Sequence, residues 1–93
     1  MEKLEKQSIG STRTSILIIV NGRPHEWEDE REIITFEQLI VLAFGSISND
    51  PNIVYTVIYK NGPQGNPEGS MVRGDLVKIQ TNMIFNATQT DKS

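Results

Sequence analysis

The sequence predicts an α+β domain in which one main helix covers one face of a β-sheet. One amphipathic stretch between residues 35 and 45 carries helix start and stop signals, and short β-branched runs lie on both sides of it. Strands precede and follow this helix without alternating with further helices, which favours a single α+β unit. The 93 residues provide for one such domain and one hydrophobic core.

A hairpin is expected at the start of the domain. Residues 15–20 are apolar and β-branched on both faces, as expected of a strand in the middle of a sheet. Asn21-Gly22 is typical of a tight hairpin turn. Residues 24–28 then form the return strand, in which His25 and Trp27 alternate with acidic residues as in an edge strand with one solvated face.

The helix has the best-specified ends of any element. Thr35 is expected to cap its start, Gln38 completes a capping box, and Ile34 precedes the cap as half of a hydrophobic staple. Gly45 supplies the left-handed stop, so the helix should span residues 36–44. Its apolar stripe consists of Phe36, Leu39, Ile40, Ala43 and Phe44.

The second half of the chain reads as strands joined by turns. Residues 46–52 are expected to form a loop and residues 53–59 the clearest strand of the chain. Further strands are predicted at 71–72, 76–80 and 83–88. The loop from Gly62 to Ser70 is rich in glycine and proline, but it follows the helix and lacks a Gly-Lys-Ser/Thr ending, which favours plain turns over phosphate binding.

Composition excludes several classes of function. The absence of cysteine excludes disulfides and thiolate metal sites, and with no secretion signal it favours the cytoplasm. The longest apolar run, residues 16–20, is too short to span a membrane, so we expect a soluble protein. The net charge of -3 and the lack of a basic cluster argue against nucleic-acid binding.

No catalytic or metal-binding set is visible, so an enzyme is not expected. His25 has no second histidine or cysteine, and Thr90 and Ser93 have no neighbouring base. Trp27 is either a core residue or an exposed interface anchor, and with Glu26 and Glu28 it forms the candidate partner surface. The acidic run can be a solvated face or can dock on a basic groove; it comprises Glu26, Glu28, Asp29, Glu30 and Glu32.

Both ends of the chain are predicted to be flexible. Residues 1–14 have few large apolar side chains and should form an N-terminal arm. The domain is then expected over residues 15–88, followed by a flexible tail at 89–93. The candidate site for processing and conjugation is the polar C-terminal segment Asn86, Ala87, Thr88, Gln89, Thr90, Asp91, Lys92 and Ser93.

Several motifs together resemble a known family. They are Val20-Asn21-Gly22-Arg23-Pro24, Ile33-Ile34-Thr35-Phe36-Glu37-Gln38-Leu39, Tyr55-Thr56-Val57-Ile58-Tyr59 with Asn61-Gly62-Pro63, Glu68-Gly69-Ser70-Met71-Val72, and Gly74-Asp75-Leu76-Val77-Lys78. In this order they resemble the bacterial ubiquitin-like domains of the multiubiquitin family, here in a single copy over residues 16–93. The resemblance implies a β-grasp fold, the fold of ubiquitin.

The resemblance also implies a role as a protein modifier. Such proteins are encoded beside homologues of ubiquitin-activating and ubiquitin-conjugating enzymes and a processing peptidase, which would be the partners. The activating enzyme uses ATP to activate the C-terminal carboxylate, so the modifier, expected to be a monomer, needs no cofactor of its own. The acyl group then passes to target proteins.

The chain departs from the ubiquitin pattern at its end, where Lys92-Ser93 stands in place of Gly-Gly. Three alternatives follow: a peptidase trims the tail within residues 86–92, the enzymes accept a larger terminal residue, or the protein is never conjugated. In the last case the domain would act non-covalently, by docking a surface patch or adding its edge strand to another sheet.

Overall fold

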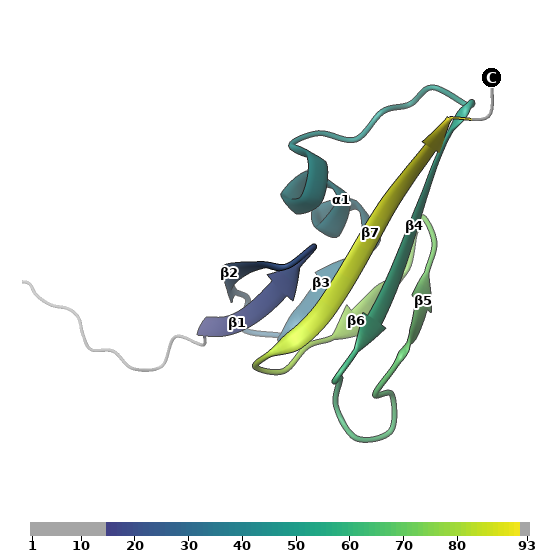
Figure 1. The fold of residues 1–93 in the computed structure, drawn as a ribbon. Coiled ribbons are helices and arrows are strands. Elements are labelled where there is room, and N and C mark those ends of the chain that lie inside the picture. Colours follow the sequence, from purple (N-terminus) through teal and green to yellow (C-terminus); the bar gives the residue numbers. More distant parts are fainter. Residues whose placement is uncertain (1–14, 92–93) are drawn as a thin grey trace, which may run out of the picture.

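The computed structural model describes residues 15–91, which form one layer of sheet with one helix packed on it (Figure 1). The elements in chain order are β1 (Ser15–Val20), β2 (Arg23–Glu28), β3 (Ile33–Thr35), α1 (Phe36–Phe44), β4 (Ile53–Lys60), β5 (Gly69–Met71), β6 (Leu76–Lys78) and β7 (Met83–Asp91). The expected N-terminal arm, residues 1–14, lies outside the described residues. The expected α+β class is confirmed.

The main sheet has five strands in the order β2-β1-β7-β4-β5. It is mixed, because β1 and β7 run parallel while the other neighbours are antiparallel. The first and last strands of the domain therefore meet in the middle of the sheet, and the hairpin partner β2 lies at its edge, as predicted. This mixed sheet with one covering helix is the architecture of a β-grasp domain.

The hairpin and the helix have the predicted local geometry. Asn21 and Gly22 both adopt positive φ, 53° and 81°, as a type I′ turn requires. The Thr35 hydroxyl oxygen accepts from the Gln38 amide at 3.1 Å, and the Gln38 side-chain oxygen accepts from the Thr35 amide at 2.9 Å. Gly45, at φ 88°, ends the helix and donates its N–H to the Val41 carbonyl.

The core lies between α1 and one face of the main sheet. Side chains alternate along the strands, so every second residue is buried along β1, along β4 from Tyr55 to Tyr59, and along β7 from Met83 to Ala87. The largest fully buried side chains are Phe36, Phe85, Ile18, Ile34, Leu39, Ile40, Met71, Met83, Val20 and Val57. Residues 15–20 lie inside the sheet between β2 and β7, as predicted, and only their face toward the helix is buried; Leu17, on the other face, is 38% exposed.

The short strands differ most from prediction. β3 was not expected; it pairs with β6 in a separate two-stranded sheet, with Ile34 opposite Val77. β6 ends at Lys78, two residues early, and β5 begins at Gly69 inside the expected loop. These strands are set by pairing with distant residues, which local sequence does not encode. No helix within residues 15–91 is long and apolar enough to cross a membrane.

Candidate functional site

The predicted C-terminal segment lies mostly in β7, the central strand. β7 pairs with β4 from Ile84, opposite Lys60, to Asp91, opposite Ile53. β1 pairs with it only at Met83 to Phe85. The first half of β7 is therefore held on both sides, and the second half pairs with a strand on one side only.

The expected end of the last strand at Thr88 is wrong. The strand continues to Asp91, because β4 runs opposite it as far as Ile53. The alternating threonines of this segment also suit an extended backbone. Residues 89–91 of the expected flexible tail are thus part of the sheet, and Lys92 and Ser93 lie outside the described residues.

The buried part of β7 ends before the strand itself ends. Ala87, 6% exposed, is the last buried residue of β7, and the four residues from Thr88 to Asp91 are all exposed. This end of β7 contributes backbone pairing but no core side chain. Figure 1 shows β7 and β4 extending together beyond the helix. A segment of this kind can separate from the body at little cost to the core.

Asn21 binds β7 just beyond the point where β1 stops pairing with it. Its side-chain oxygen accepts from the Ala87 N–H at 2.7 Å, and its amide group donates to the Ala87 carbonyl at 3.2 Å. Its own N–H donates to the Phe85 carbonyl at 2.9 Å. The side chain thereby supplies the two hydrogen bonds that a further residue of β1 would make to β7. The sequence identified Asn21 only as a turn residue.

Trp27 is half-buried, between the two alternatives considered from the sequence. It lies on β2 opposite Ile16, on the face that carries the helix, and packs against the core. Its indole N–H donates to the Ile33 carbonyl at 3.1 Å. Glu26 and Glu28 alternate with it and are exposed on the opposite face of the strand. The candidate partner surface therefore splits into an apolar and an acidic side.

The acidic run continues past β2 into a turn. The Asp29 carboxylate accepts from the Arg31 N–H at 2.8 Å and forms an ion pair with the Arg31 side chain at 3.4 Å. The backbone bond is the main reason that the pKa of Asp29 is lowered; partial desolvation opposes it and the Arg31 side chain adds to it. Asp29 therefore stays ionised at neutral pH.

The residues weighed for metal or phosphate binding do not assemble a site. Within residues 15–91, no three histidine or carboxylate side chains are grouped to hold a metal ion. In the glycine-rich loop, Gly62 donates its N–H to the Pro67 carbonyl, and the Asn66 side chain accepts from the Tyr59 hydroxyl at 2.8 Å. These bonds fold the loop on itself and onto β4, as expected of plain turns.

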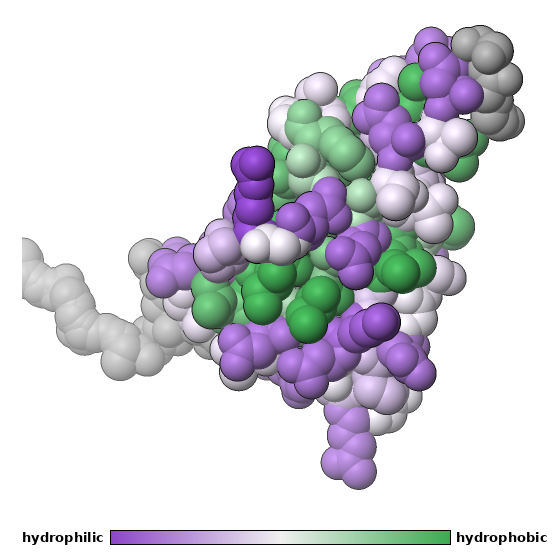
Figure 2. Space-filling view, viewed as in Figure 1, coloured by the Kyte–Doolittle hydropathy of each residue, from purple (hydrophilic) through white to green (hydrophobic). Residues whose placement is uncertain are grey.

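The outer face of the main sheet is a second exposed surface. Leu17 and Ile58 are 38% and 44% exposed there, and the register places Ile19 beside Ile84 between them. Figure 2 shows green side chains gathered over β1 and the adjoining part of β7, with purple ones around them. Because residues 16–20 are apolar without a break, Leu17 and Ile19 indicate this face once the helix is known to cover only the other.

The geometry defines a class of protein. A mixed sheet with one helix, and a central C-terminal strand that runs past its core, are the features of a ubiquitin-like β-grasp domain. Comparison with family models identifies which: the chain belongs to the multiubiquitin family, whose model matches residues 16–91. Comparisons with curated proteins and with solved structures give no match.

Proposed function

We propose that this ubiquitin-like protein is a covalent modifier of other proteins in the bacterial cytoplasm. In this role it is a substrate of partner enzymes and has no catalytic activity or cofactor of its own. The observation that carries the proposal is the exposed end of β7, Thr88 to Asp91, which no core side chain anchors. Family membership over residues 16–91 supports the same role.

The chemistry requires only a carboxylate at the end of this segment. A carboxylate oxygen attacks the α-phosphorus of ATP on the activating enzyme and releases pyrophosphate. A nucleophile of the enzyme then attacks the acyl carbon and releases AMP, and a conjugating enzyme passes the acyl group to a nucleophile of the target. The free energy comes from ATP, and this chain supplies the acyl group and a body for recognition.

The reactive residue lies within residues 86–93 in this proposal. Because no Gly-Gly is present, we propose that a peptidase trims the segment or that the enzymes accept a larger terminal residue. We propose that this single-copy domain is encoded beside the activating enzyme, the conjugating enzyme and the peptidase, which are its partners.

The test is a reconstitution with the partner enzymes. The full chain is incubated with the activating-enzyme homologue, ATP and the peptidase, and intact mass is measured. We expect a shortened chain, an adenylate or an ester-linked or thioester-linked enzyme adduct. If the reactive carboxylate lies on one of residues 89–93, deleting these residues should abolish the adduct, while a cooperative melting transition shows that the domain still folds, because the core ends at Ala87.

The control is Ile58→Lys, which changes the outer sheet face and leaves the C-terminal segment intact. It should still form the adenylate. If the full chain never forms an adduct and is never trimmed in its native cells, the modifier role is contradicted. Binding to a partner that persists after deletion of residues 89–93 would then favour the second candidate, a non-covalent interaction domain that uses the exposed apolar face around Leu17 and Ile58.

A further inference from the structure

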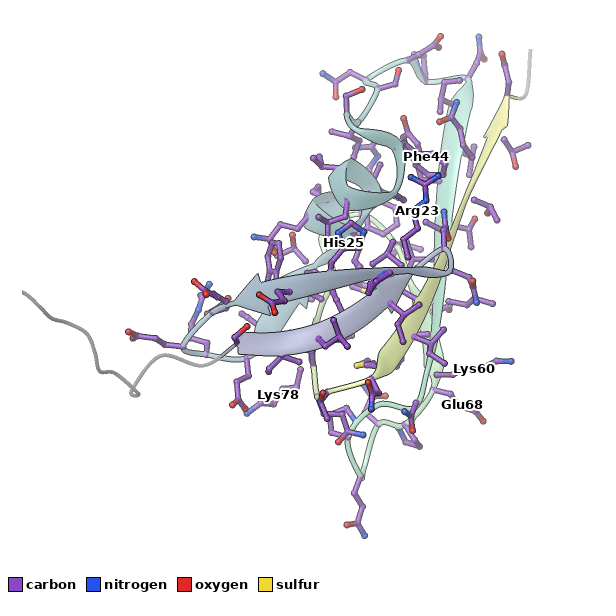
Figure 3. All side chains as sticks on the ribbon, turned by 60° about the vertical axis from the view of Figure 1, so that its left-hand side comes forward. Arg23, His25, Phe44, Lys60, Glu68 and Lys78 are labelled. Atoms are coloured by element: carbon purple, nitrogen blue, oxygen red, sulfur yellow. The ribbon has the colours of Figure 1, made fainter. Side chains whose placement is uncertain are left out.

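The chain contains two asparagine-glycine dipeptides, Asn21-Gly22 and Asn61-Gly62. Asparagine is a thermolabile residue, and a following glycine, which has no Cβ, leaves its main-chain nitrogen open to react with the asparagine side chain. Both asparagines are exposed and have positive φ, 53° and 61°. Figure 3 shows Arg23, which follows the first dipeptide, and Lys60, which precedes the second, on different parts of the surface. Each dipeptide therefore has its own surroundings.

The glycine nitrogen is accessible in the first dipeptide but not in the second. Gly22 is exposed, a Cβ added to it would meet nothing within 4 Å, and its N–H has no hydrogen-bond partner among the described residues. Gly62 is buried, and its N–H donates to the Pro67 carbonyl at 2.8 Å. A Cβ there would lie 2.7 Å from the Asn66 carbonyl oxygen. The main-chain nitrogen is thus free to react at Gly22 and is held at Gly62.

The other reacting group of the first dipeptide is the Asn21 carboxamide, which β7 holds. Its two hydrogen bonds to Ala87, at 2.7 and 3.2 Å, restrain the rotation that would bring its carbonyl carbon to the Gly22 nitrogen. Ala87 is the last buried residue of β7 and directly precedes the exposed end of the strand. Local opening of that end therefore loosens Ala87 and frees the carboxamide.

We propose that Asn21 is a site of spontaneous deamidation, which proceeds when the end of β7 opens. The Gly22 nitrogen forms a bond to the side-chain carbonyl carbon of Asn21. The bond from that carbon to the side-chain nitrogen breaks, and this nitrogen leaves as ammonia with the proton of the Gly22 N–H. A cyclic imide remains, and water adds to one of its two carbonyl carbons and opens the ring to aspartate or isoaspartate. Water is the only co-reactant, and no group is oxidised or reduced.

The product holds β7 less firmly than asparagine does. An aspartate carboxylate has no donor for the Ala87 carbonyl, and one of its oxygens would face the carbonyl oxygen across the 3.2 Å that a hydrogen bond now spans. Isoaspartate adds a methylene group to the main chain of a two-residue turn, which changes the geometry that the hairpin requires. The reaction thus makes a transient opening of the C-terminal segment permanent. This modification goes beyond the modifier role and does not depend on it.

The test follows both dipeptides in the same folded chain. The full chain is incubated at mildly alkaline pH in water labelled with a heavy oxygen isotope, which hydrolysis of the imide incorporates. Tryptic peptides are then weighed: residues 14–31 contain Asn21, because the Arg23-Pro24 bond resists trypsin, and residues 61–73 contain Asn61. We expect labelling at Asn21 to be at least about fivefold faster, because at Asn61 both the carboxamide and the following nitrogen are held. In urea that unfolds the chain, the two rates should be similar.

A pair of variants tests whether β7 controls the reaction. Thr88→Pro removes an N–H that faces β4 and so weakens the end of β7. It should speed labelling of Asn21 at least about fivefold and leave Asn61 within about twofold. Thr35→Ala, in the helix cap, is the control, because it lowers the stability of the whole domain; it should change labelling of Asn21 by less than about twofold. If Thr88→Pro does not melt cooperatively, deletion of residues 89–93 takes its place.

The effect of the modification is tested by substitution. Asn21→Asp reproduces the aspartate product, and the Thr88 amide, which faces β4, should exchange at least about threefold faster in this variant. Asn61→Asp introduces the same charge at the other dipeptide and should leave exchange of Thr88 within about twofold.

Any of four results would overturn the proposal. The first is the absence of label at Asn21 in the folded chain after about a hundredfold longer than the unfolded chain needs, because opening two hydrogen bonds slows the reaction by no more than that order. The second is labelling of Asn61 as fast as Asn21. The third is equal acceleration by Thr88→Pro and Thr35→Ala, which would assign the reaction to global unfolding. The fourth is unchanged exchange of Thr88 in Asn21→Asp. These measurements use no ATP and no partner enzyme, so their failure is separate from failure of the conjugation assay.

Discussion

At the scale of the residue, Asn21 has two structural roles, one through its backbone and one through its side chain. Its backbone takes the left-handed conformation of the hairpin turn, and its carboxamide holds both polar backbone groups of Ala87. Asparagine is among the few residues that tolerate the first task and have the donor and acceptor for the second. The turn that starts the domain therefore also secures the strand that ends it.

Two substitutions of Asn21 should separate these tasks. Asn21→Gly keeps the turn but removes both hydrogen bonds, and we expect a loss of about 1–3 kcal/mol in the free energy of unfolding. Asn21→Ala should cost about 1 kcal/mol more, because alanine resists positive φ. Urea denaturation measures both. Asn82→Gly, which also replaces a left-handed asparagine, is the control and should change little.

The sequence alone predicts only the first of these two roles of Asn21, the one in the turn. The dipeptide Asn21-Gly22 predicts the turn, because turn geometry depends on neighbouring residues. Its bond to Ala87 joins positions 66 residues apart, and no local pattern encodes that contact. A strong stability loss in Asn21→Gly would show that the distant contact matters, whereas a neutral effect would reduce Asn21 to a turn residue.

At the scale of the element, the helix was predicted with the ends it has, 36–44, whereas β3 was not predicted and the bounds of β5, β6 and β7 differ from those expected. Its ends depend on Thr35, Gln38 and Gly45, all within one turn of the helix terminus. β3 and the last three residues of β7 depend on partners elsewhere, β6 and β4. A depression between β2 and α1, lined by Trp27 and Val41 among others, was not predicted for the same reason, since it joins two elements that only the fold brings together.

The capping box should be measurable as a reciprocal unit. Thr35→Ala removes an acceptor for the Gln38 N–H and should reduce the free energy of unfolding by about 0.5–2 kcal/mol. Gln38→Ala should cost less, and the double variant should cost less than the sum of the two, because the two bonds orient each other. Chemical denaturation of the three variants gives the coupling. Strict additivity would contradict the reciprocal bonds.

At the scale of the whole molecule, the two ends of the domain meet in the centre of the sheet. β1 and β7 lie side by side, and β7 then leaves β1 behind and continues along β4 alone. The core and the exposed terminal segment are thus parts of one strand. This arrangement can give a rigid body and a detachable end without a linker, which a modifier needs if its carboxylate is to enter an enzyme.

Hydrogen exchange should reveal a stability step along β7. Amides of Met83 and Phe85 lie among buried residues and should exchange only through global unfolding. The Ala87 N–H points to Asn21 on the β1 side, so the amides of Thr88 and Thr90 point to β4. They lie in an exposed segment, and local opening should let them exchange at least about tenfold faster. Peptide-resolved exchange at several urea concentrations distinguishes the two, because local opening depends little on urea. If the whole strand exchanged as one unit, the end of β7 could enter an active site only when the domain unfolds, and the modifier proposal would lose its structural support.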